Sequence, residues 1–365
     1  MYSFEPDEEQ RMLVDAVGKY AQNELRMAAH EADEQRELPK RLIAKGWEMG
    51  VLQASIPEAY GGYGSRSVVT GALATEELAF GDLAGAYAVM APSLFAIPIC
   101  MAGNEAQKQE YLPRIVGGNW NPYTAALIEY AYDFDPNELH TTARPEGSGY
   151  VISGEKAYVP FASDATAILV FANCEGRTQG FFVPRGAAGL TISDDREQLM
   201  GLNALPLFRV KLEGVRVSAH DRLGGDAGHD FAPILASMRV ASASAAIGVA
   251  RAAFEYSRDY AREREVFGVK IAQKQAIAFM LAEMATEIEA MRLLVWEAAW
   301  KLDVGKEDAF TEAYLAATGA ADMVMMVTDR AVQILGGHGY IRDHPVEMWM
   351  RNGRGFAMLT GLAIV

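Results

Sequence analysis

Residues 264–268 read REVFG and residues 333–339 read QILGGHG, and the two long helices predicted between these motifs decide the fold. From Ile271 to Leu302 the chain contains no glycine or proline, and Ala, Leu, Met and Glu, all strong helix formers, dominate. One apolar stripe is expected on this helix, formed by side chains three or four residues apart: Ile277, Leu281, Met284 and Ile288. A second helix is predicted over residues 308–335, and it should end at Gly336 and Gly337, because glycine tolerates the left-handed dihedral angles of a helix C-terminus.

The first third of the chain is predicted to be helical throughout. Residues 7–34 carry apolar side chains at helical spacing, and a shorter helix starts at Pro39 and ends before Gly50. Helices resume near Val68 and continue, with glycine and proline breaks, to Ile115.

Short β-branched and aromatic runs separated by turn residues occupy the middle of the chain, between residues 121 and 222. They include YVISG at 150–154, AILVF at 167–171 and GFFVP at 180–184, and they predict short antiparallel strands of a sandwich or barrel. After residue 225 the pattern is helical again. We therefore expect an α+β protein with three domains in chain order: a helical domain at 1–118, an antiparallel β domain at 119–223 and a second helical domain at 224–365.

Composition narrows the class of protein. The formal net charge of −15 argues against nucleic acid and against an anionic membrane surface as partners. Cys100 and Cys174 are the only cysteines, and the six histidines include no i, i+4 pair, so neither a disulfide framework nor a metal site is expected. Residues 1–10 are acidic without a signal-peptide core, and no uncharged run reaches the roughly 20 apolar residues that span a bilayer. A cytoplasmic soluble protein is expected.

The order of helices, strands and helices, together with the motifs R-x-x-F-G and Q-x-x-G-G-x-G, resembles the acyl-CoA dehydrogenase family. PEAYGG at 57–62 and GEK at 154–156 add to the resemblance, which covers nearly the whole chain. It implies an N-terminal helical domain, a middle β domain and a C-terminal four-helix bundle. It also implies a tetramer in which each FAD lies between two subunits and accepts two hydrogens from Cα and Cβ of an acyl thioester.

The resemblance implies that residues between Arg264 and Gly337 bind the cofactor. The candidate cofactor-binding positions are Arg264, Phe267, Gln275, Gln333, Ile334, Gly336 and Gly337. Arg264 would pair with the FAD pyrophosphate, because a guanidinium matches phosphate oxygens in a bidentate way, and Phe267 and Gln275 would flank the adenine end. Gln333 and the backbone at Gly336–Gly337 would approach the ribose and pyrophosphate. In the family these residues serve the FAD held mainly by a neighbouring subunit.

A plainer interpretation makes Arg264 a solvated helix residue and Gly336–Gly337 a simple helix cap. The presence of both motifs in order favours FAD over that interpretation. His338 is interpreted as a turn residue of the motif rather than as a catalytic base.

The family's general base has no counterpart in this sequence. It is a glutamate just before a glycine near the C-terminus, and the matching residue is Thr360, before Gly361. A subset of the family carries the glutamate just before an arginine that matches Arg239, and that position is Met238. Neither threonine nor methionine accepts a proton at neutral pH, so we expect no catalytic residue in this chain.

The family's flavin loop, Thr-Glu-Pro followed by Gly-Ser-Asp, corresponds to IEYAYDFD at residues 128–135. The hydroxyl donors expected there fall on Ile128 and Phe134, and apolar groups leave a polar cofactor without its hydrogen bonds. The Thr or Ser that bonds flavin N5 falls on Pro160, which has neither a hydroxyl nor a backbone N–H.

The losses are one-sided, since the residues that hold a subunit's own flavin are gone while those lent to a neighbour's FAD remain. We therefore expect a base-lacking subunit of a heteromeric acyl-CoA dehydrogenase of α2β2 composition, with FAD shared with a homologous partner that holds the acyl-CoA. This arrangement resembles two-gene dehydrogenases, several of which act on CoA esters of steroid side chains. Two alternatives stay open: a homo-oligomer with different flavin chemistry, such as an elimination or oxygenation, and a non-catalytic scaffold in which Arg264 and Gln333 are relics.

Overall fold

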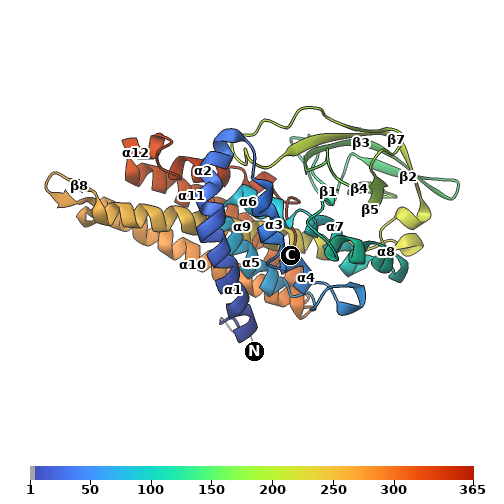
Figure 1. Cartoon of the computed structure of the whole chain (residues 1–365), viewed down its shortest axis with the longest axis horizontal. Coiled ribbons are helices and arrows are strands. Elements are labelled where there is room, and N and C mark those ends of the chain that lie inside the picture. Colours follow the sequence, from blue (N-terminus) through green and yellow to red (C-terminus); the bar gives the residue numbers. More distant parts are fainter. Residues whose placement is uncertain (1–4) are drawn as a thin grey trace.

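The computed structural model describes residues 5–365, so the first four residues of the predicted N-terminal domain lie outside it. Helices, a β-sheet and further helices follow one another along the chain, as the α+β prediction requires. The sheet occupies one end of the long axis, and the helices fill the centre and the other end (Figure 1).

The other N-terminal helices pack around α5 and α6, which are almost completely buried. Asp7 and Asn104 start α1 and α8 with reciprocal capping boxes to Gln10 and Gln107. The pair α5 and α6 consists mostly of apolar residues, and nearly all of them are buried between the neighbouring helices. The helices are α1 (Glu8–Tyr20), α2 (Arg26–Gln35), α3 (Lys40–Trp47), α4 (Val51–Ala54), α5 (Val68–Gly81), α6 (Leu83–Met90), α7 (Ser93–Ala102) and α8 (Glu105–Val116).

The middle β domain is confirmed, and its strands form a seven-stranded sheet of order β1-β4-β2-β3-β7-β6, with β5 paired to β4. Its pairing differs from the expectation in one respect: β4 runs parallel to β1 and to the start of β2, while the other pairs are antiparallel. Parallel neighbours need a long crossover, and the β2–β3 hairpin supplies it between β1 and β4. The strands are β1 (Thr124–Ala126), β2 (Thr142–Glu146), β3 (Gly149–Pro160), β4 (Ala167–Cys174), β5 (Arg177–Pro184), β6 (Leu190–Ile192) and β7 (Leu207–Ser218).

The C-terminal helical domain is built on α9, the longest helix. The remaining helices of this domain pack around it, and α5 of the N-terminal part covers another side. The elements are α9 (Ala232–Glu263), the hairpin β8 (Glu265–Val266) and β9 (Val269–Lys270), α10 (Gln275–Asp303), α11 (Ala309–Leu335), α12 (Gly337–Tyr340) and α13 (Val346–Gly353). The helix predicted over 308–335 is confirmed, whereas α10 begins four residues later than Ile271, after a 3₁₀ turn.

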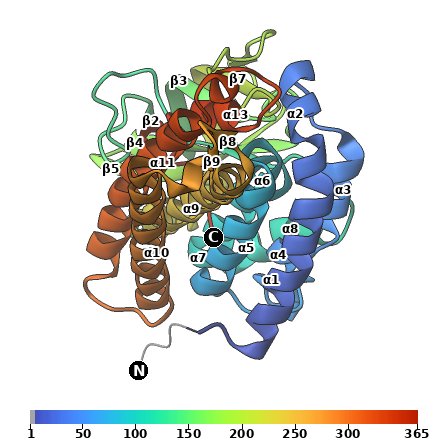
Figure 2. The same ribbon diagram turned by 90° about the vertical axis from the view of Figure 1, so that its left-hand side faces the viewer.

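Three layers of helices are visible when the molecule is viewed from its end. Figure 2 shows α1 to α3 on one side, α5 and α6 in the middle, and α9, α10 and α11 on the other side. Within residues 5–365, α9 alone is a single helix long and apolar enough to cross a membrane, although α6 and α7 would pass as one bent pair. Most of the apolar window of α9 is buried inside the protein, which is typical of a core helix.

Candidate functional site

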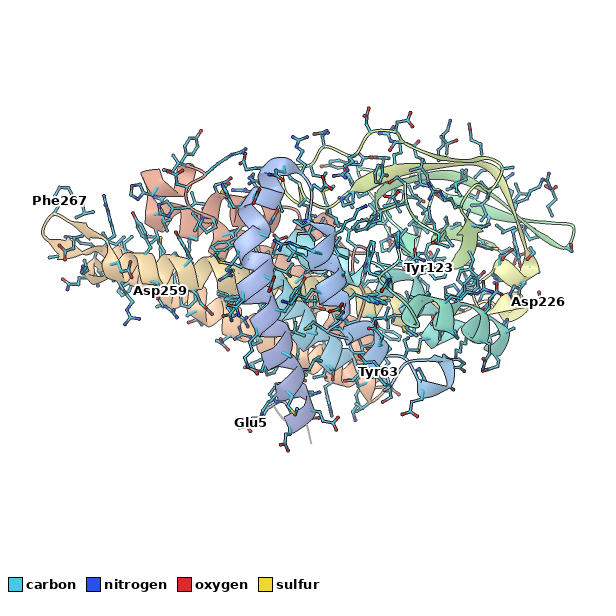
Figure 3. The ribbon with its side chains drawn as sticks, in the orientation of Figure 1. Glu5, Tyr63, Tyr123, Asp226, Asp259 and Phe267 are labelled. Atoms are coloured by element: carbon cyan, nitrogen blue, oxygen red, sulfur yellow. The ribbon has the colours of Figure 1, made fainter. Side chains whose placement is uncertain are left out.

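Arg264 and Phe267 lie at the free end of the helical domain. Arg264 follows α9 directly in an extended conformation, and its backbone accepts a hydrogen bond from Ile271 N at 2.9 Å. That bond closes the β8–β9 hairpin. Phe267 stands at the outer tip of the hairpin with a positive φ of 55° and 94% exposure, and its ring points away from the protein (Figure 3). The Phe267 ring is therefore accessible to another molecule.

The glycine turn after α11 is equally open. Gly336 ends the helix with a φ of 59°, a value that favours glycine. A Cβ atom added at Gly336 or Gly337 would meet nothing within 4 Å, so the backbone of the turn faces open space. Gln333 is exposed one turn earlier, whereas the side chain of Ile334 is buried in the core and leaves only its backbone for a ligand.

Two tyrosines and two histidines bring these segments together. The Tyr260 hydroxyl lies 2.9 Å from His338 Nδ1, and the Tyr256 hydroxyl lies 2.7 Å from His344 Nδ1. The two imidazole rings stack with centroids 5.2 Å apart and an angle of 14°. Since Tyr260 is one turn before Arg264 and His338 follows Gly337, this cluster joins the end of α9 to the glycine turn.

Sequence reasoning missed this cluster. It interpreted His338 only as a turn residue, whereas the structure gives the imidazole a fixed partner on α9. The signal was present in the sequence: Tyr256 and Tyr260 are four residues apart, so they share a helix face. The facing histidines come from a separate segment, and that part could not be found from spacing.

The residues of this surface fit the phosphate end of FAD. Among residues 5–365, no carboxylate lies within 4.0 Å of the Arg264 guanidinium, so it is not neutralised by its own chain. A guanidinium without a carboxylate partner and a glycine backbone open to solvent are both groups that bind pyrophosphate oxygens. Gln275, the first residue of α10, is also exposed near the hairpin. The surface is open rather than enclosed, so a second molecule would have to provide the opposite wall.

The positions expected to hold this chain's own flavin are apolar and packed. Ile128 is buried, and its carbonyl accepts a hydrogen bond from Ala157 N at 2.8 Å. Pro160 ends β3 opposite Leu207 of β7. Tyr158, two residues before Pro160, packs edge-on against Tyr130 with centroids 5.7 Å apart. Ile128 and Pro160 carry no hydroxyl group, and both are packed against their neighbours.

A small cavity of about 170 Å³ remains beside Tyr158, between the loop at 199–202 and the segment 351–359. Pockets that hold cofactors or drug-sized ligands measure roughly 300–1,000 Å³, so this space is too small for a flavin ring. A larger cavity of about 570 Å³ opens between α3 and the loop after β3, where Trp120 and Phe161 line it. Neither Ile128 nor Pro160 lines that larger cavity.

A buried ion pair links the loop at residues 128–135, the counterpart of the family's flavin loop, to strand β3. Lys156 Nζ is 2.7 Å from Glu129 Oε1 and donates also to the Leu127 carbonyl, while the Glu129 carboxylate accepts from the backbone N–H groups of His140 and Thr141. Burial lowers the pKa of Lys156 to about 8, although the Glu129 charge opposes this shift. Burial acts to raise the pKa of Glu129, but the Lys156 charge and the hydrogen bonds outweigh burial and lower it.

Neither position that matches the family's general base carries a carboxylate. Met238 is buried in α9, and Thr360 is half-buried after the last 3₁₀ turn. The four buried carboxylates among residues 5–365 all have structural partners: Glu129 pairs with Lys156, Glu76 with Arg251 and Arg292, Asp33 with Arg351, and Asp82 caps α6. None of these four is a free proton acceptor.

The chain matches three protein-family models in chain order. They are the acyl-CoA dehydrogenase N-terminal domain at residues 7–119, the middle domain at 125–215 and the C-terminal domain at 231–363.

Curated relatives and solved structures agree with these matches. The chain is 35% identical over 364 residues to the probable acyl-CoA dehydrogenase YngJ of Bacillus subtilis, covering 96% of this chain and 94% of that protein. It is 32% identical over 366 residues to 3-(aryl)acrylate reductase of Clostridium sporogenes, covering 98% and 96%. The solved structure of butyryl-CoA dehydrogenase from Megasphaera elsdenii superposes with a TM-score of 0.89 at 30% identity, covering 99% of this chain and 96% of that one.

Proposed function

The chain belongs to the acyl-CoA dehydrogenase family, and from that premise we propose that it is the base-lacking subunit of a heteromeric, FAD-dependent acyl-CoA dehydrogenase. A homologous subunit would supply the general base and hold both the flavin ring and the acyl-CoA. This chain would lend its exposed surface around Arg264 and Gly336–Gly337 to the adenine and pyrophosphate half of the partner's FAD. An α2β2 tetramer would then contain two FAD molecules.

One observation carries the proposal: the two groups of positions have opposite environments. Arg264, Phe267 and Gln333 are exposed at the free end of the helical domain, without a second wall. Ile128 and Met238, at positions assigned to this chain's own flavin and base, are apolar and buried. A subunit adapted to complete a neighbour's site, and not its own, accounts for both environments.

Each residue of the exposed surface around Arg264 and Gly336–Gly337 would have its own role in binding the partner's FAD. Arg264 places a positive charge and up to two parallel N–H donors on the pyrophosphate. The glycine turn lets backbone N–H groups approach phosphate or ribose oxygens without a side chain in the way. Phe267 offers a planar apolar face to the adenine end, and Gln275 and Gln333 add amide hydrogen bonds. FAD, when bound, supplies the two-electron acceptor for removal of two hydrogens from Cα and Cβ of the thioester.

The substrate class proposed is an acyl-CoA thioester bound mainly by the partner. The resemblance to two-gene enzymes makes CoA esters of steroid side chains the first substrates to try. The proposal places the complex in the cytoplasm, with which the formal charge of −15 is compatible.

The proposal is tested by co-expressing this chain with a base-bearing homologue from the same organism and counting flavin per chain in the purified complex. One FAD per two chains is expected. A yellow homotetramer of this chain alone, with one flavin per chain and activity on an acyl-CoA, would refute the heteromer and favour a homomeric flavoenzyme.

Arg264→Ala in the co-expressed complex separates a lent cofactor surface from a scaffold. A hydrogen bond to a charged group contributes about 1.5–3 kcal/mol, so the Kd for FAD should rise roughly 10- to 150-fold. Arg262→Ala is the matched control, because Arg262 is an exposed arginine two residues away in the last turn of α9. Unchanged flavin content and activity in Arg264→Ala would support the scaffold instead.

A further inference from the structure

The cavity of about 570 Å³ between α3 and the loop after β3 has the size of a small-molecule site. Pockets that hold small ligands measure roughly 300–1,000 Å³. None of the positions expected to bind FAD or to match the general base lines this cavity, so it is separate from the surface around Arg264 and Gly336–Gly337. We call it the α3 cavity.

The walls of the α3 cavity include two aromatic side chains that are fixed in place. Trp120 and Phe161 meet edge-on with ring centroids 5.0 Å apart. Trp120 Nε1 donates to the Ala88 carbonyl at 3.1 Å, and Phe161 N donates to the Pro206 carbonyl at 2.8 Å. Phe161 is held at a φ of 53°, which is strained for a bulky residue, and such residues cluster at ligand sites. An aromatic ligand would find two rings already placed for edge-on or offset packing.

Four exposed charged side chains also line the α3 cavity, two of each sign: Lys40, Arg196, Glu37 and Asp164. Within residues 5–365 none of the four forms an ion pair. Arg196 Nη1 donates to the Arg36 carbonyl at 2.6 Å, which holds the guanidinium in place and leaves its other N–H groups for a ligand. Charges of both signs beside an apolar space are complementary to a ligand that itself carries both charges.

We propose that the α3 cavity binds a small zwitterion with an aromatic body, the chemistry of an aromatic α-amino acid. The carboxylate pairs with Arg196, the ammonium group pairs with Glu37 or Asp164, and the ring packs against the two aromatic side chains of the wall. This binding site is additional to the proposed FAD surface and does not depend on it.

Four indole compounds test which charges the cavity recognises, with isothermal titration calorimetry on the full chain as the assay. L-tryptophan should show saturable binding of one molecule per chain. Indole-3-propionate lacks the ammonium group and tryptamine lacks the carboxylate, so each should bind about tenfold weaker or more, because one charge-assisted contact is lost. Indole lacks both charges and should bind most weakly.

Two variants place the binding in the α3 cavity. Ala44 is an exposed residue of α3 that lines the cavity, so Ala44→Phe should fill the space without entering the core and should abolish binding. Ala59→Phe is its control, because Ala59 is an exposed alanine that does not line the cavity. Arg196→Gln should weaken L-tryptophan about tenfold and leave tryptamine unchanged, since tryptamine has no carboxylate to lose. Arg185→Gln, at an exposed arginine outside the cavity, should change neither.

Three results would overturn the proposal: no saturable binding of L-tryptophan, equally tight binding of indole-3-propionate or tryptamine, or unchanged binding in a folded Ala44→Phe variant. Thermal unfolding by circular dichroism shows whether that variant folds. If it does not, Arg196→Gln decides, and equal losses of L-tryptophan and tryptamine affinity would contradict a carboxylate contact at Arg196.

Discussion

Replacement of Lys156 by methionine should destabilise the protein far more than the loss of one surface charge. The Lys156 side chain is 0% exposed and Glu129 is 5% exposed, so their ion pair is shielded from water. Methionine fills similar space without a charge and leaves the Glu129 carboxylate buried with only its two backbone donors. The loop at residues 128–135 would then lose its link to β3.

The expected magnitude follows from burial of an unpaired charge. Breaking a buried ion pair costs about 3–5 kcal/mol, whereas replacing both partners by neutral groups of similar volume is often nearly neutral. Unfolding entropy of about 2.1 cal/mol/K per residue amounts to about 0.8 kcal/mol/K for this chain, so Lys156→Met should lower the melting temperature by about 4–7 °C. The double variant Lys156→Met with Glu129→Gln should be closer to the unaltered protein than either single variant, because no charge is left buried.

The pH dependence gives an independent check. The folded-state pKa of Glu129 is lowered, so this group contributes stability above its ordinary pKa of about 4.5, and that contribution is lost as the pH falls through the folded-state value. Without Lys156 the pKa of Glu129 should rise and the carboxylate should take up a proton in mild acid. The stability gap between Lys156→Met and the unaltered protein should therefore narrow from pH 7 to pH 5.

Thermal unfolding by circular dichroism at both pH values measures these differences. Lys211→Met is the matched control, because Lys211 is an exposed lysine on β7 paired with exposed Glu213, and its loss should leave the melting temperature unchanged. The reasoning is refuted if the single and double variants are equally destabilised, or if the gap is the same at pH 7 and pH 5.

Two further substitutions test the helical core. Burial raises the pKa of Asp82 from 3.8 to about 6, so ionisation costs stability as the pH rises between these values, by about 3 kcal/mol in total. Asp82→Asn should therefore stabilise the protein at pH 7 but not near pH 4, as measured by urea unfolding. The asparagine side chain can still accept the hydrogen bond from Gly85 N, so the helix cap is kept. Lower stability of the variant at pH 7 would mean that the attraction of the carboxylate to the helix dipole outweighs the cost of its burial. Gly248→Ala should cost about 1–3 kcal/mol, because its Cβ would lie 2.3 Å from the Glu76 carbonyl oxygen of α5. Gly118→Ala, whose Cβ would meet nothing within 4 Å, should change stability little, and equal effects at Gly248 and Gly118 would contradict close packing of α5 on α9.

Much of the fold was predictable because its signals are local. The absence of glycine and proline from 271 to 302, with apolar residues three or four apart, predicted α10, and the glycines at 336 and 337 predicted the end of α11. The switch to β-branched and aromatic runs predicted the middle domain. The absence of a carboxylate at positions 238 and 360 was likewise visible in the sequence, because the residue type at a position can be read without the structure.

The sequence alone determined the order of the elements, the two motifs and the residues missing from them, since each depends on neighbours within a few positions. Only the tertiary structure decided which distant groups meet. The parallel pairing of β1 with β4, the Tyr260–His338 contact and the packing of Val365 on Gly71 join segments about 40 to 300 residues apart. Local sequence patterns do not predict such contacts. They form when apolar faces of distant segments are buried against each other, and the polar groups buried with them must then form hydrogen bonds.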